Sequence, residues 1–403
     1  MTTAALSIRE DAAERFRSLG YPTPRMEEWK YTNVAPIAKV SWSAGRPRAA
    51  SAAETAAAPA ATLTFLNGRI VQKNETRGLR ILPISEAAQS DLEPYYGRIA
   101  DWQRNAFVAL NIANSEDGAL IIADGVVDGF VHLVFIGEGD DVWSHPHNII
   151  VANRVAQLTV VETYLGRGKH FTNTVTEIFA GPGAVVDHYK IVREPDEAFH
   201  VGSVQIRQDR SSSVTSHNAC LGGGLVRNDI NVSLAGEGAS LTLDGLFVVT
   251  GNQHVDNHTL IDHIAPHCES HELYKGILDD SARGVFDGRI IVRPGAQKTV
   301  SRQENRNLLL SETAIVDSKP TLEIHNDDVK CNHGSTIGQL EEEPLFYLRS
   351  RGIGEAEARN LLVLAFASQI VDRMKVEPVR EEVRRVLFER MPGRMTERRE
   401  AKR

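Results

Sequence analysis

The chain has 403 residues, of which 42% are hydrophobic and 24% charged, and its formal net charge is -8 at pH 7. A chain of this length buries an ample core without disulfide or metal staples, so stability does not explain its unusual residues. The negative charge argues against nucleic acid as the main partner and favours proteins or small ligands.

The three cysteines, Cys220, Cys268 and Cys331, include no Cys-x-x-Cys pair. One chain therefore cannot assemble a thiolate zinc or cluster site by itself, and the odd count favours a reducing compartment. The N-terminus meets acidic residues before any apolar segment long enough for a signal peptide, and no run of about 18 apolar residues follows. We predict a cytoplasmic protein that does not enter a membrane.

The N-terminal region is expected to be helical up to a break in composition. A short helix is predicted from Ser7 to about Leu19, and the proline-containing turn at 21–24 ends it. The stretch 49–61 is nearly all Ala, Ser and Pro, which cannot form a packed core and indicates a linker. The expected organisation is a helical region at 1–48, the linker at 49–62, a mixed α/β segment at 63–125, a β-helix core at 126–325, a C-terminal segment ending in helices at 326–390 and a basic disordered tail at 391–403.

From about residue 126 the sequence predicts short strands. Runs such as 131–136, 157–162 and 240–245 are rich in β-branched residues and alternate, or nearly alternate, between apolar and polar. Pairs of glycines that suit tight turns separate the strands, and the turns at Gly183, Gly238 and Gly295 lead into similar segments. Weak self-similarity without intervening helices favours a stacked β-solenoid, with a β-sandwich as the alternative.

Helical spacing replaces the strand pattern after Ile324. Apolar residues recur with helical periodicity from Glu355 to Met374, which predicts an amphipathic helix. Pro378 is expected to open a second helix that runs roughly to Met391.

The segment 327–334 is the strongest candidate for chemistry. Cys331 and His333 are two residues apart, so their side chains point to the same face if the backbone is extended. A thiol and an imidazole together suit iron, zinc or copper(I), but two ligands are too few for a closed site, and a second chain would have to contribute. The alternative is a buried cysteine with a hydrogen-bonded histidine on a strand.

A second candidate is the histidine-rich segment that starts at residue 254. In a strand, His254, Asp256 and His258 share one face, and His263 follows as a further ligand for a metal ion or a member of a catalytic His–Asp arrangement. The alternative is a ladder of polar side chains in stacked coils that satisfy one another.

A third feature is the alternation of aromatic and arginine residues between Glu341 and Ile353, which is typical of protein interfaces. Ordinary packing of Phe346 and Leu348 beneath a charged rim is the alternative. The chain has no Walker A loop, no Gly-x-Gly-x-x-Gly that opens a helix after a strand and no Gly-x-Ser-x-Gly elbow. We therefore do not expect it to hydrolyse nucleotides by itself.

Four stretches resemble the SufB/SufD family of iron–sulfur cluster assembly scaffold proteins: 25–32, 284–299, 308–339 and 345–353. The resemblance covers most of residues 245–372. The pattern of the SufD branch is matched from Asp327 to Thr336, and the cysteine-rich N-terminal motif found in many SufB chains is missing. The resemblance implies a right-handed parallel β-helix flanked by helical N- and C-terminal regions, in agreement with the solenoid pattern.

The resemblance also implies a function, that of a non-catalytic scaffold subunit of a SufBCD complex. Such a subunit pairs with SufB through the β-helix and holds the SufC ATPase by its C-terminal helices. His333 matches the histidine that faces a SufB cysteine where the nascent cluster forms, and Cys331 lies beside it with a role that stays open. The residues that match the SufC-docking region are Phe346, Tyr347, Leu348, Arg349, Arg351, Leu361, Leu362 and Phe366.

We expect the isolated chain to bind no cofactor tightly, the complex to carry iron or an iron–sulfur cluster transiently, and any flavin to bind at the level of the complex. Two other hypotheses stay open. One is a metal-dependent β-helix enzyme that uses the histidine-rich segment at 254–263. The other is a scaffold that forms a homodimer through the same β-helix surface when it is isolated.

Overall fold

The computed structural model describes residues 3–45, 59–74 and 79–390. Most of the predicted linker and all of the predicted tail lie outside these residues. Among the described residues, no helix is long and apolar enough to cross a membrane.

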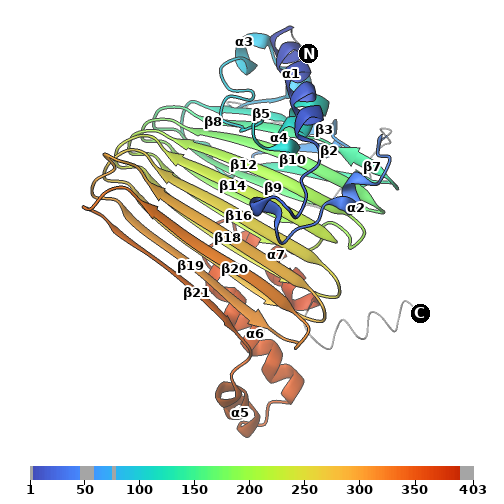
Figure 1. Cartoon of the computed structure of the whole chain (residues 1–403), viewed down its shortest axis with the longest axis vertical. Coiled ribbons are helices and arrows are strands. Elements are labelled where there is room, and N and C mark those ends of the chain that lie inside the picture. Colours follow the sequence, from blue (N-terminus) through green and yellow to red (C-terminus); the bar gives the residue numbers. More distant parts are fainter. Residues whose placement is uncertain (1–2, 46–58, 75–78, 391–403) are drawn as a thin grey trace.

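Two stacked sheets, built mainly from parallel strands, form the body of the protein (Figure 1). Within the described residues, sheet A has 11 strands and sheet B has 10. From β8 onward the chain alternates between the sheets, so each coil contributes one strand to each of them. The strands of sheet A are β1 (Ser43–Ala44), β4 (Arg80–Pro83), β5 (Ala119–Ala123), β7 (Val142–Ser144), β8 (His147–Ala152), β10 (His170–Ala180), β12 (Phe199–Gln208), β14 (Leu225–Leu234), β16 (His254–His263), β18 (Arg283–Val292) and β20 (Ile315–Ile324). The strands of sheet B are β2 (Ala61–Leu66), β3 (Arg69–Asn74), β6 (Val131–Glu138), β9 (Gln157–Arg167), β11 (Val185–Val192), β13 (Ser213–Cys220), β15 (Ser240–Val249), β17 (Glu269–Leu278), β19 (Val300–Leu309) and β21 (Lys330–Gly338).

The predicted β-solenoid with helical termini is confirmed, and it makes about eight turns. Alternating residues of each strand point into the space between the sheets, where they stack on their counterparts in the neighbouring coils. Val160, Val186 and Val214, for example, lie on consecutive strands of sheet B and belong to one buried cluster. The predicted turns at Gly183 and Gly238 have φ values of 72° and 71°, a left-handed conformation that glycine adopts without strain.

The solenoid extends beyond the predicted core of 126–325 in both directions. At its beginning, β2 and β5 already belong to the two sheets, and the antiparallel pairs β2–β3 and β4–β5 form the first edges. At its end, Ile324 does not close the strand region, because β21 adds one more rung to sheet B. The segment at 330–338, which was assigned to the C-terminal region, is therefore the last strand of the solenoid.

Helices of the N-terminal half cover the outer face of sheet A near the beginning of the solenoid (Figure 1). They are α1 (Thr3–Leu19), the 3-10 helix η1 (Glu27–Trp29), α2 (Ala35–Ala38), the 3-10 helix η2 (Ile84–Glu86), α3 (Gln89–Leu92) and α4 (Ala106–Asn114). The side chain of Asn105 caps α4 by accepting hydrogen bonds from the backbone N–H groups of Phe107 and Val108. Val108 and Ile112 of this helix then pack on Val175 of the sheet.

The segment at 25–32 is fastened to the same outer face further along the solenoid. Arg227 on β14 donates to the carbonyl oxygen of Glu28 at 3.0 Å, and its guanidinium lies 4.4 Å from the ring centre of Trp29. Lys319 on β20 contacts Glu27 at 2.8 Å. These contacts connect the N-terminal segment to strands that lie almost 200 to 300 residues later in the sequence.

Three helices follow the last strand: α5 (Glu342–Ser350), α6 (Glu355–Val371) and α7 (Glu377–Glu389). The two predicted helices correspond to α6, which ends three residues before Met374, and to α7, which has Pro378 in its first turn. Both pack against the outer face of sheet B, and an ion pair of 2.9 Å joins Arg373 to Asp244. Helix α5 protrudes from the body below the last strands (Figure 1).

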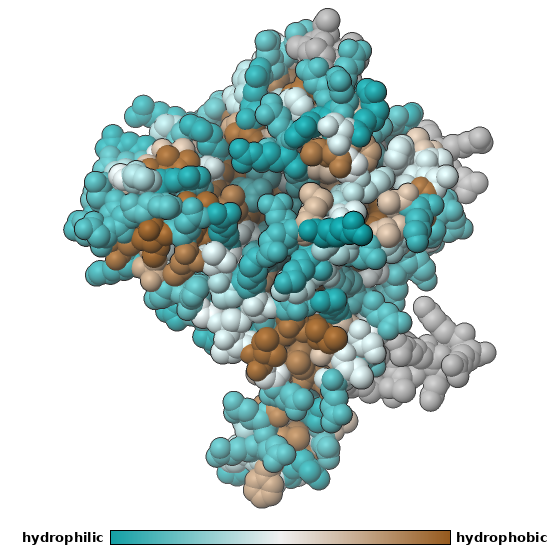
Figure 2. Space-filling view, in the orientation of Figure 1, coloured by the Kyte–Doolittle hydropathy of each residue, from teal (hydrophilic) through white to brown (hydrophobic). Residues whose placement is uncertain are grey.

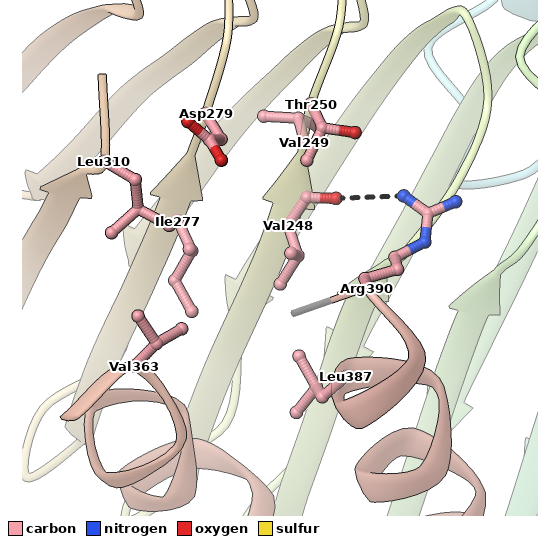
Figure 3. Close-up of a pocket in the computed structure, with 9 residues that line it drawn as sticks. All are labelled: Val248, Val249, Thr250, Ile277, Asp279, Leu310, Val363, Leu387 and Arg390. Atoms are coloured by element: carbon pink, nitrogen blue, oxygen red, sulfur yellow. Dashed lines mark hydrogen bonds between the residues drawn. The ribbon is translucent and has the colours of Figure 1, made fainter. Parts of the chain in front are cut away.

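The contact between the C-terminal helices and sheet B is closely packed (Figure 3). Val363 on α6 and Leu387 on α7 point toward Val248 and Ile277 on β15 and β17, and the cavity between them measures about 10 Å³. A space of that size holds one water at most. This interface is therefore a structural contact and offers no room for a ligand.

Replacement of Ile370 by alanine should lower the free energy of unfolding by about 2–5 kcal/mol, because the side chain is fully buried where α6 meets sheet B. Urea denaturation of the full chain measures this change. Leu361→Ala on the exposed side of the same helix is the matched control and should have a small effect. Equal losses in the two variants would contradict the observed packing of α6.

Candidate functional site

Cys331 and His333 lie on β21, the last strand of the solenoid. Cys331 pairs with Ser301 and His333 with Gln303 on the neighbouring strand β19. Ser301 and Gln303 are buried and face the space between the sheets. Because paired residues of parallel strands point to the same side of a sheet, Cys331 and His333 face this interior as well.

No further coil of the described chain covers this interior face, so the end of the solenoid is open. His333 is exposed and Cys331 is half-buried, although their counterparts one coil earlier are almost inaccessible. The predicted pairing of a thiol and an imidazole on one face therefore exists, at a position where atoms of another molecule can reach both groups.

The thiol of Cys331 packs against the hydrophobic core of the solenoid. Burial raises its pKa above the usual value, although the backbone of Ser301 counteracts this in part. A thiol with a raised pKa stays protonated at neutral pH, and only the thiolate is a good metal ligand.

A column of hydroxyl groups lies behind Cys331 in the preceding coils. The imidazole Nε2 of His263 is 2.9 Å from the hydroxyl of Ser270, which is 2.7 Å from the hydroxyl of Ser301. Burial lowers the pKa of His263 to about 4, so its ring is neutral at pH 7.

A second column lies behind His333. The side-chain nitrogen of Gln303 donates to Oε2 of Glu272 at 2.6 Å, and Glu272 occupies the same register position one coil earlier. Burial raises the pKa of Glu272 to about 7, and the hydrogen bond from Gln303 counteracts this shift only in part. No sequence pattern indicates Gln303 or Glu272, because single polar residues within strands carry no motif.

The histidine-rich segment forms β16, and three of its four candidates lie together. His254, Asp256 and His258 share one face of the strand, as expected from their spacing, and this is the outer face of sheet A. Thr32 donates a hydrogen bond to Asp256 and lies 2.8 Å from Nε2 of His254, while Nε2 of His258 is 3.1 Å from Asp256.

The guanidinium of Arg227 neutralises the carboxylate of Asp256. The guanidinium of Arg227 is 2.6 Å from Asp256 and also binds Asp229 at 2.7 Å. Burial alone would raise the pKa of Asp256, but Arg227 and His258 hold it well below the usual range. This arrangement fastens the segment at 25–32 to sheet A.

The grouping of His263 with the other three candidates is wrong. It is nine positions after His254, an odd number, so strand alternation turns its side chain into the solenoid interior, where it meets Ser270. Within residues 3–45, 59–74 and 79–390, no group of three or more His, Cys, Asp or Glu side chains is arranged to hold a metal ion.

A cleft of about 530 Å³ lies between the N-terminal segment and the outer face of sheet A. His258 belongs to its lining, and so do charged side chains that pair with one another. Lys319, for example, binds Glu27 at 2.8 Å and lies 3.6 Å from Asp287. These ion pairs account for part of the charged lining.

The predicted docking residues divide into an exposed and a packed group. Phe346 and Tyr347 on the protruding helix α5 are 73% and 57% exposed, and Leu361 on α6 is also exposed. Arg349 and Arg351 are exposed beside them, while Leu348 and Leu362 are half-buried. Phe366 packs against the body, because the ammonium group of Lys275 donates to its carbonyl oxygen and lies 4.0 Å from its ring centre.

Fold and site together define a β-solenoid protein whose open end presents an imidazole and a thiol on the interior face of the last coil. The SufBD core domain of the SUF system for FeS cluster assembly matches residues 135–366, and the N-terminal region of SufBD proteins matches residues 2–128. The chain therefore belongs to the SufBD family of iron–sulfur cluster assembly proteins.

Relatives from several bacteria agree with this assignment. An iron–sulfur cluster assembly SufBD family protein of Synechocystis is 32% identical over 93% of this chain and 89% of its own length. The iron–sulfur cluster assembly protein SufD of Escherichia coli is 34% identical over 64% of this chain and 61% of its own length. SufD of Bacillus subtilis is 28% identical over 63% of this chain and 59% of its own length.

The raised pKa of Glu272 predicts a pH-dependent effect of Glu272→Gln. Below about pH 4.5 the carboxyl is protonated in both states, whereas between about pH 4.5 and 7 the unfolded chain loses the proton and the folded chain keeps it. This group's contribution to the free energy of unfolding therefore falls as the pH rises. The difference between variant and wild type should shift in favour of the variant by about 3 kcal/mol from pH 4 to pH 8.

Urea denaturation at these two pH values measures the shift. Glu269→Gln, on an exposed position of the same strand, is the matched control and should show no such change. A Glu272→Gln variant with the same difference from wild type at both pH values would contradict the burial of an ionisable carboxyl.

Proposed function

We propose that the chain is a non-catalytic scaffold subunit that pairs with a SufB-type chain at the open end of its solenoid, in a SufBCD-type complex. The observation that carries this proposal is the uncovered last coil, which has His333 and Cys331 on its interior face. Two potential ligands on one chain are too few for a closed cluster site, so the remaining ligands come from the partner.

The edges of the last coil support a partner that continues the solenoid. Strands β20 and β21 end sheets A and B, and each has a neighbour on one side only among the described residues. Unpaired strand edges bind strands of other chains, and proteins normally protect them. Ile315, Ile324 and Ile337 on these strands are 54%, 42% and 51% exposed, an apolar surface that a partner would bury.

Chemistry favours His333 as this chain's contribution to the nascent cluster. A neutral imidazole is a good ligand for iron, and thiolates hold most iron–sulfur clusters. Burial disfavours the thiolate form of Cys331, so we assign the thiolate ligand to the SufB-type partner. Iron and sulfide are then cargo of the complex.

The protruding helix α5 is the proposed docking surface for the SufC ATPase. It holds the exposed aromatics Phe346 and Tyr347, and the guanidinium of Arg351 lies 5.2 Å from the ring centre of Tyr347. Aromatic and arginine side chains dominate the binding energy of protein interfaces. Figure 2 shows apolar side chains at the lower end of the body and on this protruding unit, among mostly hydrophilic surroundings.

His333→Ala should reduce cluster formation about tenfold or more, because the complex loses a ligand while the sheets stay intact. Anaerobic reconstitution of the three-protein complex with absorption spectroscopy measures the yield. Asn332→Ala is the matched control, since Asn332 points to the opposite face of the same strand. An undiminished yield in His333→Ala would overturn the role given to this histidine.

Phe346→Ala should weaken SufC binding roughly 30-fold, as expected for a central aromatic of an interface, and leave SufB pairing unchanged. Ile337→Lys should weaken SufB pairing and leave SufC binding unchanged, because it puts a charge on the edge of β21. Co-purification of each variant with both partners tests the two surfaces independently. Loss of both partners in either variant would contradict their assignment to separate surfaces.

A further inference from the structure

Three polar residues occupy the same register position on consecutive strands of sheet B. Glu272 on β17 pairs with Gln303 on β19, and Gln303 pairs with His333 on β21. Their side chains therefore form one column along the axis of the solenoid, which ends at the open coil. The proposed ligand is the outermost member of this column.

The middle member of the column has an unused acceptor. The side chain of Gln303 is fully buried, and its nitrogen donates to Glu272 at 2.6 Å. Its carbonyl oxygen Oε1 has no hydrogen-bond partner. A buried polar atom without a partner destabilises the fold, so this unpaired oxygen calls for an explanation.

His333 lacks the partner that Gln303 could supply. Its imidazole makes no hydrogen bond to any residue that the structure describes. Neighbouring strands lie about 4.8 Å apart, so a small rotation of either side chain brings a ring nitrogen within hydrogen-bond distance of the orphan oxygen.

A neutral imidazole has one N–H group and one nitrogen with a free lone pair. A histidine ligand binds metal through the lone pair and donates its N–H to an oxygen acceptor, which fixes the tautomer and the orientation of the ring. Gln303 suits this task because its NH2 group donates to Glu272, while its carbonyl oxygen has no partner and can accept a hydrogen bond from the histidine.

We propose that Gln303, held by Glu272, is a positioning residue for His333. Its side-chain oxygen accepts a hydrogen bond from one ring nitrogen and presents the lone pair of the other nitrogen to the cluster. The use of that lone pair rests on the function proposed above, whereas the hydrogen bond itself is a property of this chain alone.

The neighbouring column provides the contrast that an experiment needs. Ser301 lies two residues before Gln303 on the same strand, faces the same interior and stands behind Cys331. Its hydroxyl already bonds that of Ser270 at 2.7 Å. Ser301→Ala therefore changes the polarity of the same coil without removing the acceptor for His333.

The test is nitrogen-15 NMR of the full chain with labelled histidine, in which the His333 signals are identified by their loss in His333→Asn. The wild type should show one dominant tautomer of His333. Gln303→Met, which conserves volume but has no acceptor, should return the ring to the tautomer mixture of a free histidine. Ser301→Ala should retain the wild-type tautomer.

Glu272→Gln is the second variant, and it tests the same contact if Gln303→Met does not fold. It keeps the side-chain size but lets the amide of Gln303 reverse, because the new amide can both donate and accept, whereas at pH 8 the ionised carboxylate of Glu272 only accepts. The tautomer preference of His333 should therefore weaken. An unchanged His333 tautomer in a folded Gln303→Met or in Glu272→Gln would overturn the proposal.

Cluster reconstitution with the same variants separates this inference from the proposed function. Gln303→Met should lower the cluster yield about tenfold, as loss of an outer partner of a metal-bound histidine usually does. Gln303→Met could change the tautomer of His333 while His333→Ala leaves the cluster yield unchanged. In that case the contact between Gln303 and His333 is supported and the proposed cluster role of His333 is wrong.

Discussion

The structure depends on the in-register stacking of parallel strands. Each strand satisfies its backbone N–H and C=O groups with the strands of the coils before and after it, so every residue stands on a counterpart one coil earlier. This constraint forms the apolar core between the sheets. It also means that the ladder ends with unsatisfied groups wherever the coils stop.

Stacking imposes strict conditions on polar residues of the interior. A buried polar group in one coil needs a partner in the next coil, because no water reaches it. Hydrogen bonds between coils join Glu272 to Gln303 and join His263, Ser270 and Ser301, whereas the side-chain oxygen of Gln303 still lacks a partner. The last coil lacks the next neighbour, so His333 and Cys331 stay available to another molecule. The physical rule that orders the interior therefore also creates the proposed site.

The two ends of the solenoid differ in how the chain protects them. At the beginning, the antiparallel strands β3 and β4 and the helices around α4 cover the first coils. At the other end, α6 and α7 turn back along the outer face of sheet B and do not close the last coil. The open end and the protruding helix α5 offer two surfaces, which suits a subunit that contacts two different proteins.

The sequence by itself determined the class of fold and the strongest candidate residues. Glycine turns and β-branched runs without helices indicated the solenoid, and the spacing of two residues placed Cys331 and His333 on one face, since alternation is a local property of a strand. The same local rule also places the side chains of His263 and His254 on opposite faces of their strand, so the predicted metal group of all four residues was inconsistent with it. Helical periodicity gave α6 and α7 but not α5, whose aromatic and arginine residues follow an interface pattern.

Only the tertiary structure decided which coils stack on which. The residues Val185, Ser213, Ser240, Glu269, Val300 and Lys330 occupy equivalent positions on successive strands of sheet B, and the intervals between them vary from 27 to 31 residues. Loops of unequal length cause this variation, so no fixed period in the sequence reveals the register. The column of Glu272, Gln303 and His333, the ion pair of Arg227 with Asp256 and the open end of the last coil all depend on that register. They follow from hydrogen bonding between distant strands, which a reading of local patterns does not contain.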